Sequence, residues 1–268
     1  MKIDLIIPVY NEQDFLADCL DSIQQQTVKP DRVIVVNNNS TDQSLEIIQS
    51  YPFVTIINES KQGVFYARTT GFDYSKADLM VRIDADTILP SDYIQTVQQI
   101  FTNQTNLDAV TGSVAYYDCL WPKLSYQVDL ILRQSLVTLL DKSMFLYGSN
   151  MVIKKSAYLK VRPKLHFNPK IHEDIDLALH CQEEKLNLVY KKELLVNISS
   201  RRFAVGFKDF MLYALATPAT YFYHRKLKGL YFYPLLFLSM IFYLLIWLNV
   251  KPVASQQSFK RVNPVNLE

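Results

Sequence analysis

The chain has 268 residues, of which 28 are Lys or Arg and 26 are Asp or Glu, and hydrophobic residues make up 49% of it. That length fits one large α/β domain or two small ones, and that apolar content excludes a wholly disordered chain. The six glycines are so widely spaced that neither the G-x-G-x-x-G dinucleotide fingerprint nor the G-x-x-x-x-G-K-[ST] phosphate loop occurs.

The first 115 residues alternate short apolar segments with segments of helical character. The apolar segments predict strands at 3–9, 32–36, 54–58, 79–83 and 109–115. The segments between them predict helices at 15–26, 41–49, 64–74 and 91–101. Short strands separated by helices predict an α/β fold, with a mostly parallel mixed sheet flanked by helices.

Polar clusters follow three of these predicted strands at the point where each strand ends. They are Val9-Tyr10-Asn11-Glu12, Asn37-Asn38-Asn39-Ser40 and Asp84-Ala85-Asp86. Ligands of such sheets bind at the carboxyl ends of the strands, so we expect the three loops to meet in one crevice. Two carboxylates at i and i+2 can together hold Mg²⁺ or Mn²⁺ and leave positions open for phosphate oxygens.

The alternation weakens after residue 115. We predict helices at 120–140, 174–184 and 203–223, and strands at 147–153 and 188–196. The three cysteines are isolated, and no C-x-x-C or Cys/His cluster in the sequence indicates zinc. Three reduced, buried thiols are the plain interpretation.

Residues 230–250 contain no charged side chain. A helix of that length spans about 31 Å, the thickness of a bilayer's hydrocarbon core, so we predict a transmembrane helix over 229–251. A buried core helix and helices lying in the membrane interface are the alternatives. The basic stretch 224–228 precedes the run, and the positive-inside rule therefore favours a single-pass cell-membrane protein with residues 1–228 in the cytoplasm.

The charge distribution also favours a membrane. Residues 1–200 hold 19 Lys or Arg against 24 Asp or Glu, whereas residues 201–268 hold nine against two. A basic end on an acidic body indicates an anionic surface nearby. Beside so long an apolar run, we expect that surface to be a membrane and not a nucleic acid.

Five segments in order resemble the signatures of family 2 glycosyltransferases with the GT-A fold. They are Pro8-Val9-Tyr10-Asn11-Glu12, Asn39-Ser40-Thr41-Asp42, Gly63…Ala67-Arg68…Gly71, Asp84-Ala85-Asp86 and Glu173-Asp174-Ile175-Asp176-Leu177. The resemblance covers about residues 3–203. It implies a GT-A nucleotide-diphospho-sugar transferase fold and an inverting enzyme of this family.

The resemblance implies donor-binding roles for residues on these loops and near residue 201. They are Pro8, Tyr10, Glu12, Asn37, Asn38, Arg68, Asp84, Arg201 and Arg202. Some of these assignments have alternatives. Glu12 could stabilise the N-terminus of a helix through its negative charge, and Arg68 could form a structural salt bridge. Arg201 and Arg202 could bind a lipid headgroup. Family members usually carry aspartate where this chain has Asn37 and Asn38, so the departure leaves the base recognised by the donor site open.

The resemblance also implies a metal site and a general base. Asp86, together with Asp84, would ligate the Mg²⁺ or Mn²⁺ that bridges the diphosphate. Asp174 would deprotonate the acceptor hydroxyl, with Glu173, Asp176 and His172 as competing candidates. Crowding of three carboxylates should raise the pKa of at least one of them, which suits a base.

The predicted function is transfer of a sugar from a nucleotide diphosphate sugar, UDP-linked by preference, to a hydroxyl of a lipid-linked or cell-envelope glycan. The predicted organisation is a catalytic domain over 1–203, a juxtamembrane amphipathic helix over 204–228, the transmembrane helix over 229–251 and a polar tail over 252–268. One alternative is a sugar nucleotidyltransferase, although the Gly-rich opening loop of those folds is missing. The other is a catalytically inactive membrane scaffold that binds a nucleotide or glycan.

Overall fold

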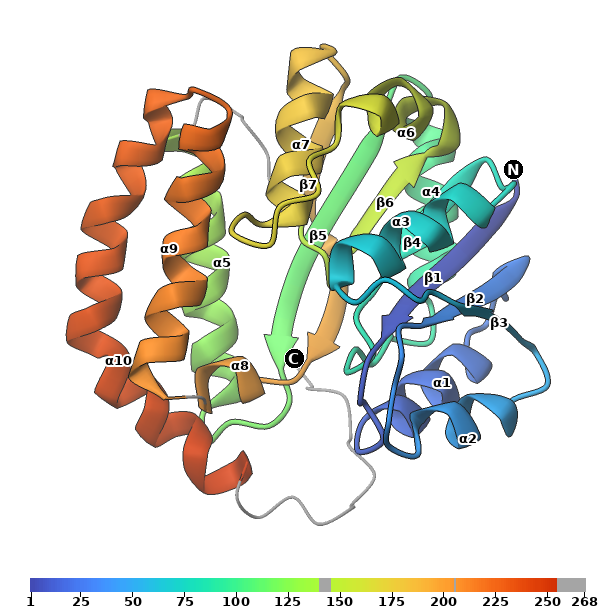
Figure 1. The fold of residues 1–268 in the computed structure, drawn as a ribbon, viewed down its shortest axis with the longest axis horizontal. Helices are drawn as coiled ribbons and strands as arrows, with labels where there is room; N and C mark the ends of the chain where they lie inside the picture. The colour runs from blue at the N-terminus through green and yellow to red at the C-terminus, as the bar shows by residue number, and fades with distance from the viewer. Residues whose placement is uncertain (140–145, 205, 255–268) are drawn as a thin grey trace.

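The computed structural model describes residues 1–139, 146–204 and 206–254. Its strands form one sheet in the order β3-β2-β1-β4-β6-β5-β7 (Figure 1). The strands are β1 (Ile3–Val9), β2 (Arg32–Asn37), β3 (Val54–Asn58), β4 (Leu79–Arg82), β5 (Ala109–Tyr116), β6 (Met151–Lys154) and β7 (Leu188–Ile198). Only β6 runs antiparallel to its neighbours within this sheet. The predicted mostly parallel mixed sheet is confirmed.

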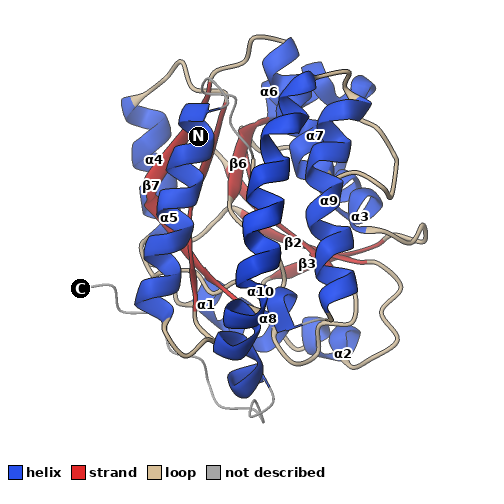
Figure 2. Ribbon diagram, turned by 90° about the vertical axis from the view of Figure 1, so that its left-hand side faces the viewer, coloured by secondary structure: helices blue, strands red, loops and turns tan. Residues whose placement is uncertain are grey.

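Helices cover both faces of the sheet and stand at its β7 end (Figures 1 and 2). They are α1 (Leu16–Gln24), α2 (Ser44–Gln49), α3 (Val64–Tyr74), α4 (Tyr93–Asn103), α5 (Pro122–Leu139), α6 (Lys155–Val161), α7 (Glu173–Glu183), α8 (Arg201–Ala204), α9 (Phe207–Tyr223) and α10 (Phe232–Ala254). Two 3₁₀ turns, η1 (Arg162–Lys164) and η2 (Leu227–Tyr231), complete the described elements.

The core consists of two apolar layers, one on each face of the sheet. Along β1, Leu5 and Ile7 pack with residues of α1 and α4 on one face. Ile6 points the other way and packs with residues of α3, α6 and α7. Alternate side chains of a strand face opposite sides, so a continuous apolar strand of this kind needs helices on both sides.

The predicted strand over 147–153 is shorter in the structure. It begins at Met151, because the chain turns just before it, with the N–H of Asn150 donating to the carbonyl of Tyr147 at 2.9 Å. Directly after this strand the chain enters α6, a helix that the sequence analysis did not predict. The turn is important for the site, since it carries Gly148.

The C-terminal helices pack against the rest of the fold. Figure 2 shows α5, α10 and α9 side by side over the sheet. At the start of α10, Phe232 is buried against Tyr221 and the apolar side chains of α7. Further along α10, the ring of Tyr243 lies 5.0 Å from Phe207 and 5.2 Å from Phe210.

The predicted transmembrane helix over 229–251 is not supported by the structure. In the described parts of the chain, no helix combines the length and the apolar character that crossing a membrane requires. The first residues of the predicted span belong to η2, and side chains at both ends of α10 make contacts within the protein. Most of the predicted polar tail, from residue 255 on, lies outside the described residues.

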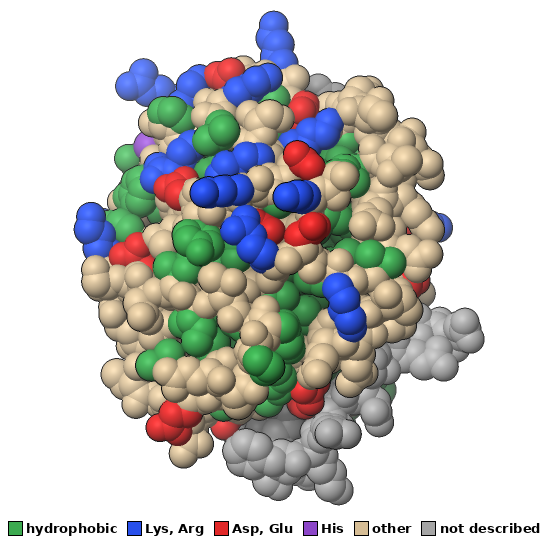
Figure 3. Space-filling view, turned by 90° about the vertical axis from the view of Figure 1, so that its right-hand side faces the viewer, with side chains coloured by type: hydrophobic (Ala, Val, Ile, Leu, Met, Phe, Trp, Pro, Cys, Tyr) green, Lys and Arg blue, Asp and Glu red, His purple; other side chains and the backbone are tan. Residues whose placement is uncertain are grey.

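The side of the molecule away from the C-terminal helices has a mostly polar and charged surface (Figure 3). There, Lys and Arg side chains are interspersed with Asp and Glu, and hydrophobic side chains lie scattered between them (Figure 3). Mixed charges of this kind are ordinary for a solvated protein surface.

Candidate functional site

The loops after β1 and β2 contact each other at the carboxyl edge of the sheet. The N–H of Asn38 donates to the carbonyl of Val9 at 2.8 Å. Beyond the strands, Oδ1 of Asn11 accepts from the N–H of Thr41 at 2.8 Å. Asn11 and Asn39 adopt left-handed φ angles of 53° and 61°, a conformation that asparagine tolerates better than most residues. Two of the polar clusters that we expected to meet therefore lie side by side.

Asn37 and Asn38, predicted to contact the donor, are both buried. Nδ2 of Asn38 donates to the carbonyl oxygens of Glu59 and Lys61, at 2.9 and 2.7 Å. Its Oδ1 accepts from the N–H of Gly63 at 2.7 Å. An aspartate at position 38 would turn a carboxylate toward two carbonyl oxygens, so the loop before α3 requires the amide. Asn37 is engaged in a similar way, and a donor contact by either side chain stays a prediction.

Arg201, at the start of α8, joins the loop after β1 to the D-x-D segment after β4. Its Nη2 donates to Oε1 of Glu12 at 2.7 Å, and its Nε donates to Oδ2 of Asp86 at 2.9 Å. The guanidinium lies over the ring of Phe15, 4.5 Å from the ring centroid. The structure thus brings together two residues predicted to bind the donor, Glu12 and Arg201, and the predicted metal ligand Asp86.

Burial shapes the electrostatics of these carboxyl groups. It raises the pKa of Asp86 to about 7, with Arg201 opposing the rise and the nearby Asp84 and Glu12 adding to it. Burial also raises the pKa of Glu12. A carboxyl with a pKa near 7 is only partly ionised at neutral pH, and a divalent cation beside it would favour the charged form.

The residues present fit the predicted Mg²⁺ or Mn²⁺. Asp86 uses Oδ2 for Arg201, and no residue in the described part of the chain donates a hydrogen bond to its Oδ1. The side chain of Asp84 is 42% exposed at the same edge. Oε2 of Glu12 is buried and has no hydrogen-bond partner among the described residues. Hard carboxylate oxygens of this kind are the ligands that both ions prefer.

Arg82, inside β4, connects the D-x-D segment to α7. Its Nη2 lies 2.9 Å from Oδ1 of Asp84, and its Nη1 lies 3.2 Å from Oε1 of Glu173. Gly148 leaves room for this side chain, because a Cβ at Gly148 would lie 1.9 Å from Nη1 of Arg82. This bridge is not among the contacts that the sequence predicts. Its signal is a charged residue at the end of an apolar strand, two residues before Asp84.

Asp174, the predicted base, lies in the first turn of α7 and accepts two backbone hydrogen bonds. Oδ2 accepts from the N–H of Gly148 at 3.0 Å, and Oδ1 accepts from the N–H of Ile175 at 2.8 Å. Burial raises the pKa of Asp174, and the neighbouring Glu173 raises it further. The pKa of Glu173 is lowered, because two buried arginines outweigh the effect of its own burial. Of these adjacent carboxyls, Asp174 therefore has the greater proton affinity, as a base needs.

The remaining predicted donor residues differ in exposure. Arg68 is fully buried, and its Nη1 donates at 2.6 Å to a carbonyl at the start of α7. That contact favours its structural role, the positioning of α7. Arg202 lies over the ring of Tyr213, 4.4 Å from the centroid. Pro8 is partly buried in β1, and Tyr10 is exposed beside it.

A family model described as "Glycosyl transferase family 2" matches residues 4–162, more than half of the chain. The chain belongs to this family. GlyG, a glycosyltransferase of Streptococcus pneumoniae, is 26% identical over 196 residues, which cover 66% of this chain and 64% of GlyG. An uncharacterized glycosyltransferase of Haemophilus influenzae is 26% identical over 232 residues, which cover 79% of this chain and 87% of that protein. GlyA, another glycosyltransferase of Streptococcus pneumoniae, is matched over only 14% of its own length.

Solved structures share the GT-A fold with this chain. The mannosyltransferase PcManGT from Pyrobaculum calidifontis, in complex with GDP-Man and Mn²⁺, has a TM-score of 0.63 at 17% identity, over 95% of this chain and 73% of that one. S. aureus TarS 1–349, in complex with UDP-GlcNAc, has a TM-score of 0.60 at 14% identity, over 82% of this chain and 66% of that one. At such low identity the likeness shows the fold alone.

Proposed function

We propose that this glycosyltransferase moves a sugar from a nucleoside diphosphate sugar to a hydroxyl acceptor, with inversion at the anomeric carbon. The observation that carries the proposal is the Arg82 bridge between Asp84 and Glu173. The bridge links Asp84 of the D-x-D segment to Glu173, the residue before Asp174. Family membership supplies the reaction class, and the two linked segments supply residues for its two halves, donor activation and acceptor deprotonation.

On the donor side, Asp84 and Asp86 would hold Mg²⁺ or Mn²⁺. When bound, the ion supplies positive charge beside the leaving diphosphate. Arg201 adds a fixed cation at the same place, held by Glu12 and Asp86. The GDP-Man and Mn²⁺ in the PcManGT structure, and the UDP-GlcNAc in the TarS structure, support a nucleotide sugar as donor. Among nucleotide sugars, we propose a UDP-sugar as the preferred donor.

On the acceptor side, Asp174 would take the proton of the acceptor hydroxyl. The hydroxyl oxygen then attacks the anomeric carbon from the face opposite the diphosphate. The bond from that carbon to the diphosphate oxygen breaks, and the nucleoside diphosphate leaves with the electron pair. Two backbone N–H groups orient the carboxylate of Asp174 for this task.

For the acceptor we propose a lipid-linked or cell-envelope glycan, reached from the cytoplasmic face of the cell membrane. The support is an apolar surface on the C-terminal helical region. Leu227 is 77% exposed, Phe237 63% and Leu212 59%. Lys208 lies one helical turn before Leu212 on α9, and Lys228 follows Leu227 directly in the chain. An exposed apolar surface with basic residues suits binding in the interface of an anionic bilayer.

Flotation with vesicles tests the membrane proposal. The chain should float with vesicles that contain phosphatidylglycerol, and less with vesicles of phosphatidylcholine alone. Leu227→Ser combined with Phe237→Ser should reduce flotation. Leu159→Ser, at an exposed position on α6, should leave it unchanged. Equal flotation of the wild-type chain with both vesicle types would contradict an electrostatic contribution, and no flotation with either would end the proposal.

A donor screen tests the catalytic proposal. UDP- and GDP-sugars are each incubated with the chain, with Mn²⁺ or with EDTA, in the presence of lipid extracts as acceptor. Release of nucleoside diphosphate is measured, and the anomeric configuration of the product is determined by NMR. We expect metal-dependent release from one donor class and an inverted product. Release without metal, or a product of retained configuration, would contradict the mechanism.

A further inference from the structure

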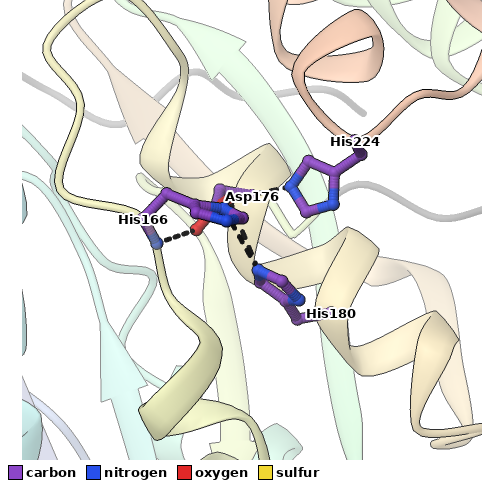
Figure 4. A group of neighbouring side chains, drawn as sticks. All are labelled: His166, Asp176, His180 and His224. Carbon is purple, nitrogen blue, oxygen red and sulfur yellow. Dashed lines mark hydrogen bonds and ion pairs between the residues drawn. The ribbon is translucent and has the colours of Figure 1, made fainter.

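Three of the chain's four histidines surround one buried aspartate of α7, Asp176 (Figure 4). They come from three separate segments of the fold. His166 lies in the loop before α7, His180 lies on α7, and His224 follows the last residue of α9. None of these side chains takes part in the proposed transfer reaction.

The three imidazole rings turn nitrogens toward the same oxygen, Oδ1 of Asp176. Nδ1 of His166 lies 2.7 Å away, Nε2 of His224 2.8 Å and Nε2 of His180 3.6 Å. Nε2 of His180 also lies 3.3 Å from Nδ1 of His166. All four candidate ligand atoms lie within 4.8 Å of one another. Around a tetrahedral Zn²⁺ with bonds of 2.0–2.1 Å, neighbouring ligand atoms are about 3.3 Å apart, so small side-chain adjustments would complete such a site.

A second set of contacts orients these ligands. Nδ1 of His180 lies 3.0 Å from Oε2 of Glu183, and Nδ1 of His224 lies 3.4 Å from Oε1 of the same side chain. The outward nitrogens of both rings thus face one carboxylate, which leaves both Nε2 atoms facing inward. The N–H of His166 donates to Oδ2 of Asp176 at 3.0 Å, which directs Oδ1 inward. Carboxylates that orient metal-bound histidines in this way are typical of zinc sites.

The charges and burial of the cluster also suit a cation. The side chains of Asp176, His224 and His180 are 0%, 2% and 6% exposed. His180 stands too far from Asp176 for a hydrogen bond, yet its Nε2 points at the same oxygen. That Nε2 also lies within hydrogen-bond distance of Nδ1 of His166, so the inward nitrogens and Oδ1 gather around one point, as the ligands of a shared cation do.

We propose that His166, Asp176, His180 and His224 bind one zinc ion. Three imidazole nitrogens and a carboxylate oxygen favour zinc, whereas the oxygen-only ligands of the D-x-D segment favour Mg²⁺ or Mn²⁺. Four protein ligands close the coordination sphere, which is typical of a structural site and not of a catalytic one. The ion would fasten the end of α9 to α7, the helix that carries the proposed base.

Metal titration of the full chain tests this inference. The protein is stripped with EDTA, dialysed, and titrated with Co²⁺, whose visible absorption is strong in tetrahedral sites and weak in octahedral ones. We expect a strong band that saturates at one Co²⁺ per chain and disappears when Zn²⁺ is added. Elemental analysis of the zinc-loaded protein should give one Zn²⁺ per chain. A weak octahedral spectrum, or no retained Zn²⁺, would overturn the proposal without testing the transferase activity.

Variants assign the signal to the cluster. His224→Gln should abolish the strong Co²⁺ band. His172→Gln is the matched control, because the fourth histidine lies outside the cluster and contacts the carbonyl of Tyr213. Asp86→Asn should also retain the band, and its loss there would place the ion at the D-x-D segment instead. If circular dichroism shows that His224→Gln does not fold, the Co²⁺ spectrum and the metal stoichiometry of the wild-type chain still test the zinc site.

Discussion

The two aspartates of the E-D-x-D segment stand two residues apart on α7 and meet different surroundings. Asp174 accepts backbone N–H groups next to Glu173, and burial raises its pKa. Asp176 is fully buried, yet its pKa is lowered, because hydrogen bonds from His224 and His166 outweigh the effect of burial. The same side chain is thus prepared to take a proton at one position and to remain an anion at the other.

Helix geometry explains the separation. Residues at i and i+2 of an α-helix point about 200° apart, so Asp174 and Asp176 lie on opposite faces of α7. Residues at i and i+4 share a face, which places His180 beside Asp176. One short acidic segment can therefore serve two sites. Glu173 and Asp174 belong to the proposed catalytic site, and Asp176 belongs to the proposed zinc site.

The largest effect is expected at the D-x-D segment, where Asp86→Asn removes the charge of a predicted metal ligand. Transfer should fall by at least about a hundredfold, as when a charge-stabilising group is lost. Zinc content should stay at one ion per chain, because the cluster on α7 is separate. Asp92→Asn, at an exposed position before α4, is the matched control and should retain activity. An active Asp86→Asn enzyme would remove this segment from the mechanism.

Arg82→Leu should lower the stability of the protein by breaking a contact with Glu173, on the same turn of α7 as Asp174. It leaves the buried Glu173 without the partner that lies 3.2 Å away, and breaking a buried ion pair costs about 3 kcal/mol in the free energy of unfolding. Arg162→Leu breaks an exposed pair with Asp73 and should cost less than about 1 kcal/mol. Urea unfolding of both variants measures the difference. Equal losses would show that the Arg82 bridge contributes no more than a surface pair.

Gly148→Ala tests the same face of α7 by steric means. The added Cβ would lie 1.9 Å from Nη1 of Arg82, so the guanidinium must move away from Glu173. We expect a loss of about 1–3 kcal/mol in unfolding free energy, as for other overpacked positions. Co²⁺ binding by the cluster on the other face should be unchanged. A variant as stable as the wild-type chain would mean that Arg82 has room to relax.

The pH dependence of stability should have opposite signs for the two aspartates in the metal-free chain. An unfolded Asp has a pKa of about 3.9. Asp176 has a lower pKa when folded, so its stabilisation is present above about pH 4 and is lost as the pH falls through the folded pKa. Asp174 has a raised folded pKa. Its contribution is therefore present below about pH 4 and is lost as the pH rises through the folded value.

Two variants separate these contributions. Urea unfolding of metal-free Asp174→Asn between about pH 4 and 7 should show a smaller loss of stability with rising pH than the wild-type chain, as the signs above require. Asp176→Asn should be less stable than the wild-type chain at neutral pH. If Asp174→Asn is less stable than the wild-type chain at neutral pH and Asp176→Asn is equally stable, the expected contributions of the two aspartates are contradicted.

Local patterns in the sequence predicted the parts of the molecule that depend on local chemistry. Continuous apolar strands and their polar ends predicted the sheet and the meeting of the loops after β1 and β2. The apolar run 230–250 predicts a membrane-spanning helix, because its composition alone does not reveal what it packs against. The structure puts Phe232 against α7 and Tyr243 against α9, so part of that apolar surface serves the fold.

The histidine cluster could not be predicted in the same way. Its ligands come from positions 166, 176, 180 and 224, and only the i, i+4 spacing of Asp176 and His180 is a local signal. The other two depend on how the loop before α7 and the end of α9 fold back onto that helix. Arg82 was more accessible to sequence analysis, since a charged residue in an apolar strand needs a buried partner.

Parallel assays of Asp174→Asn and Asp176→Asn test the central claim, that the two faces of α7 serve different sites. Each variant is measured for sugar transfer and for zinc content, with donor binding as the control. Asp174→Asn should bind donor and zinc while transfer falls about 10²–10⁴-fold, as for a lost general base. Asp176→Asn should lose zinc and retain most of its transfer activity. If Asp176→Asn abolishes transfer while Asp174→Asn preserves it, the base and the metal ligand have been assigned to the wrong faces.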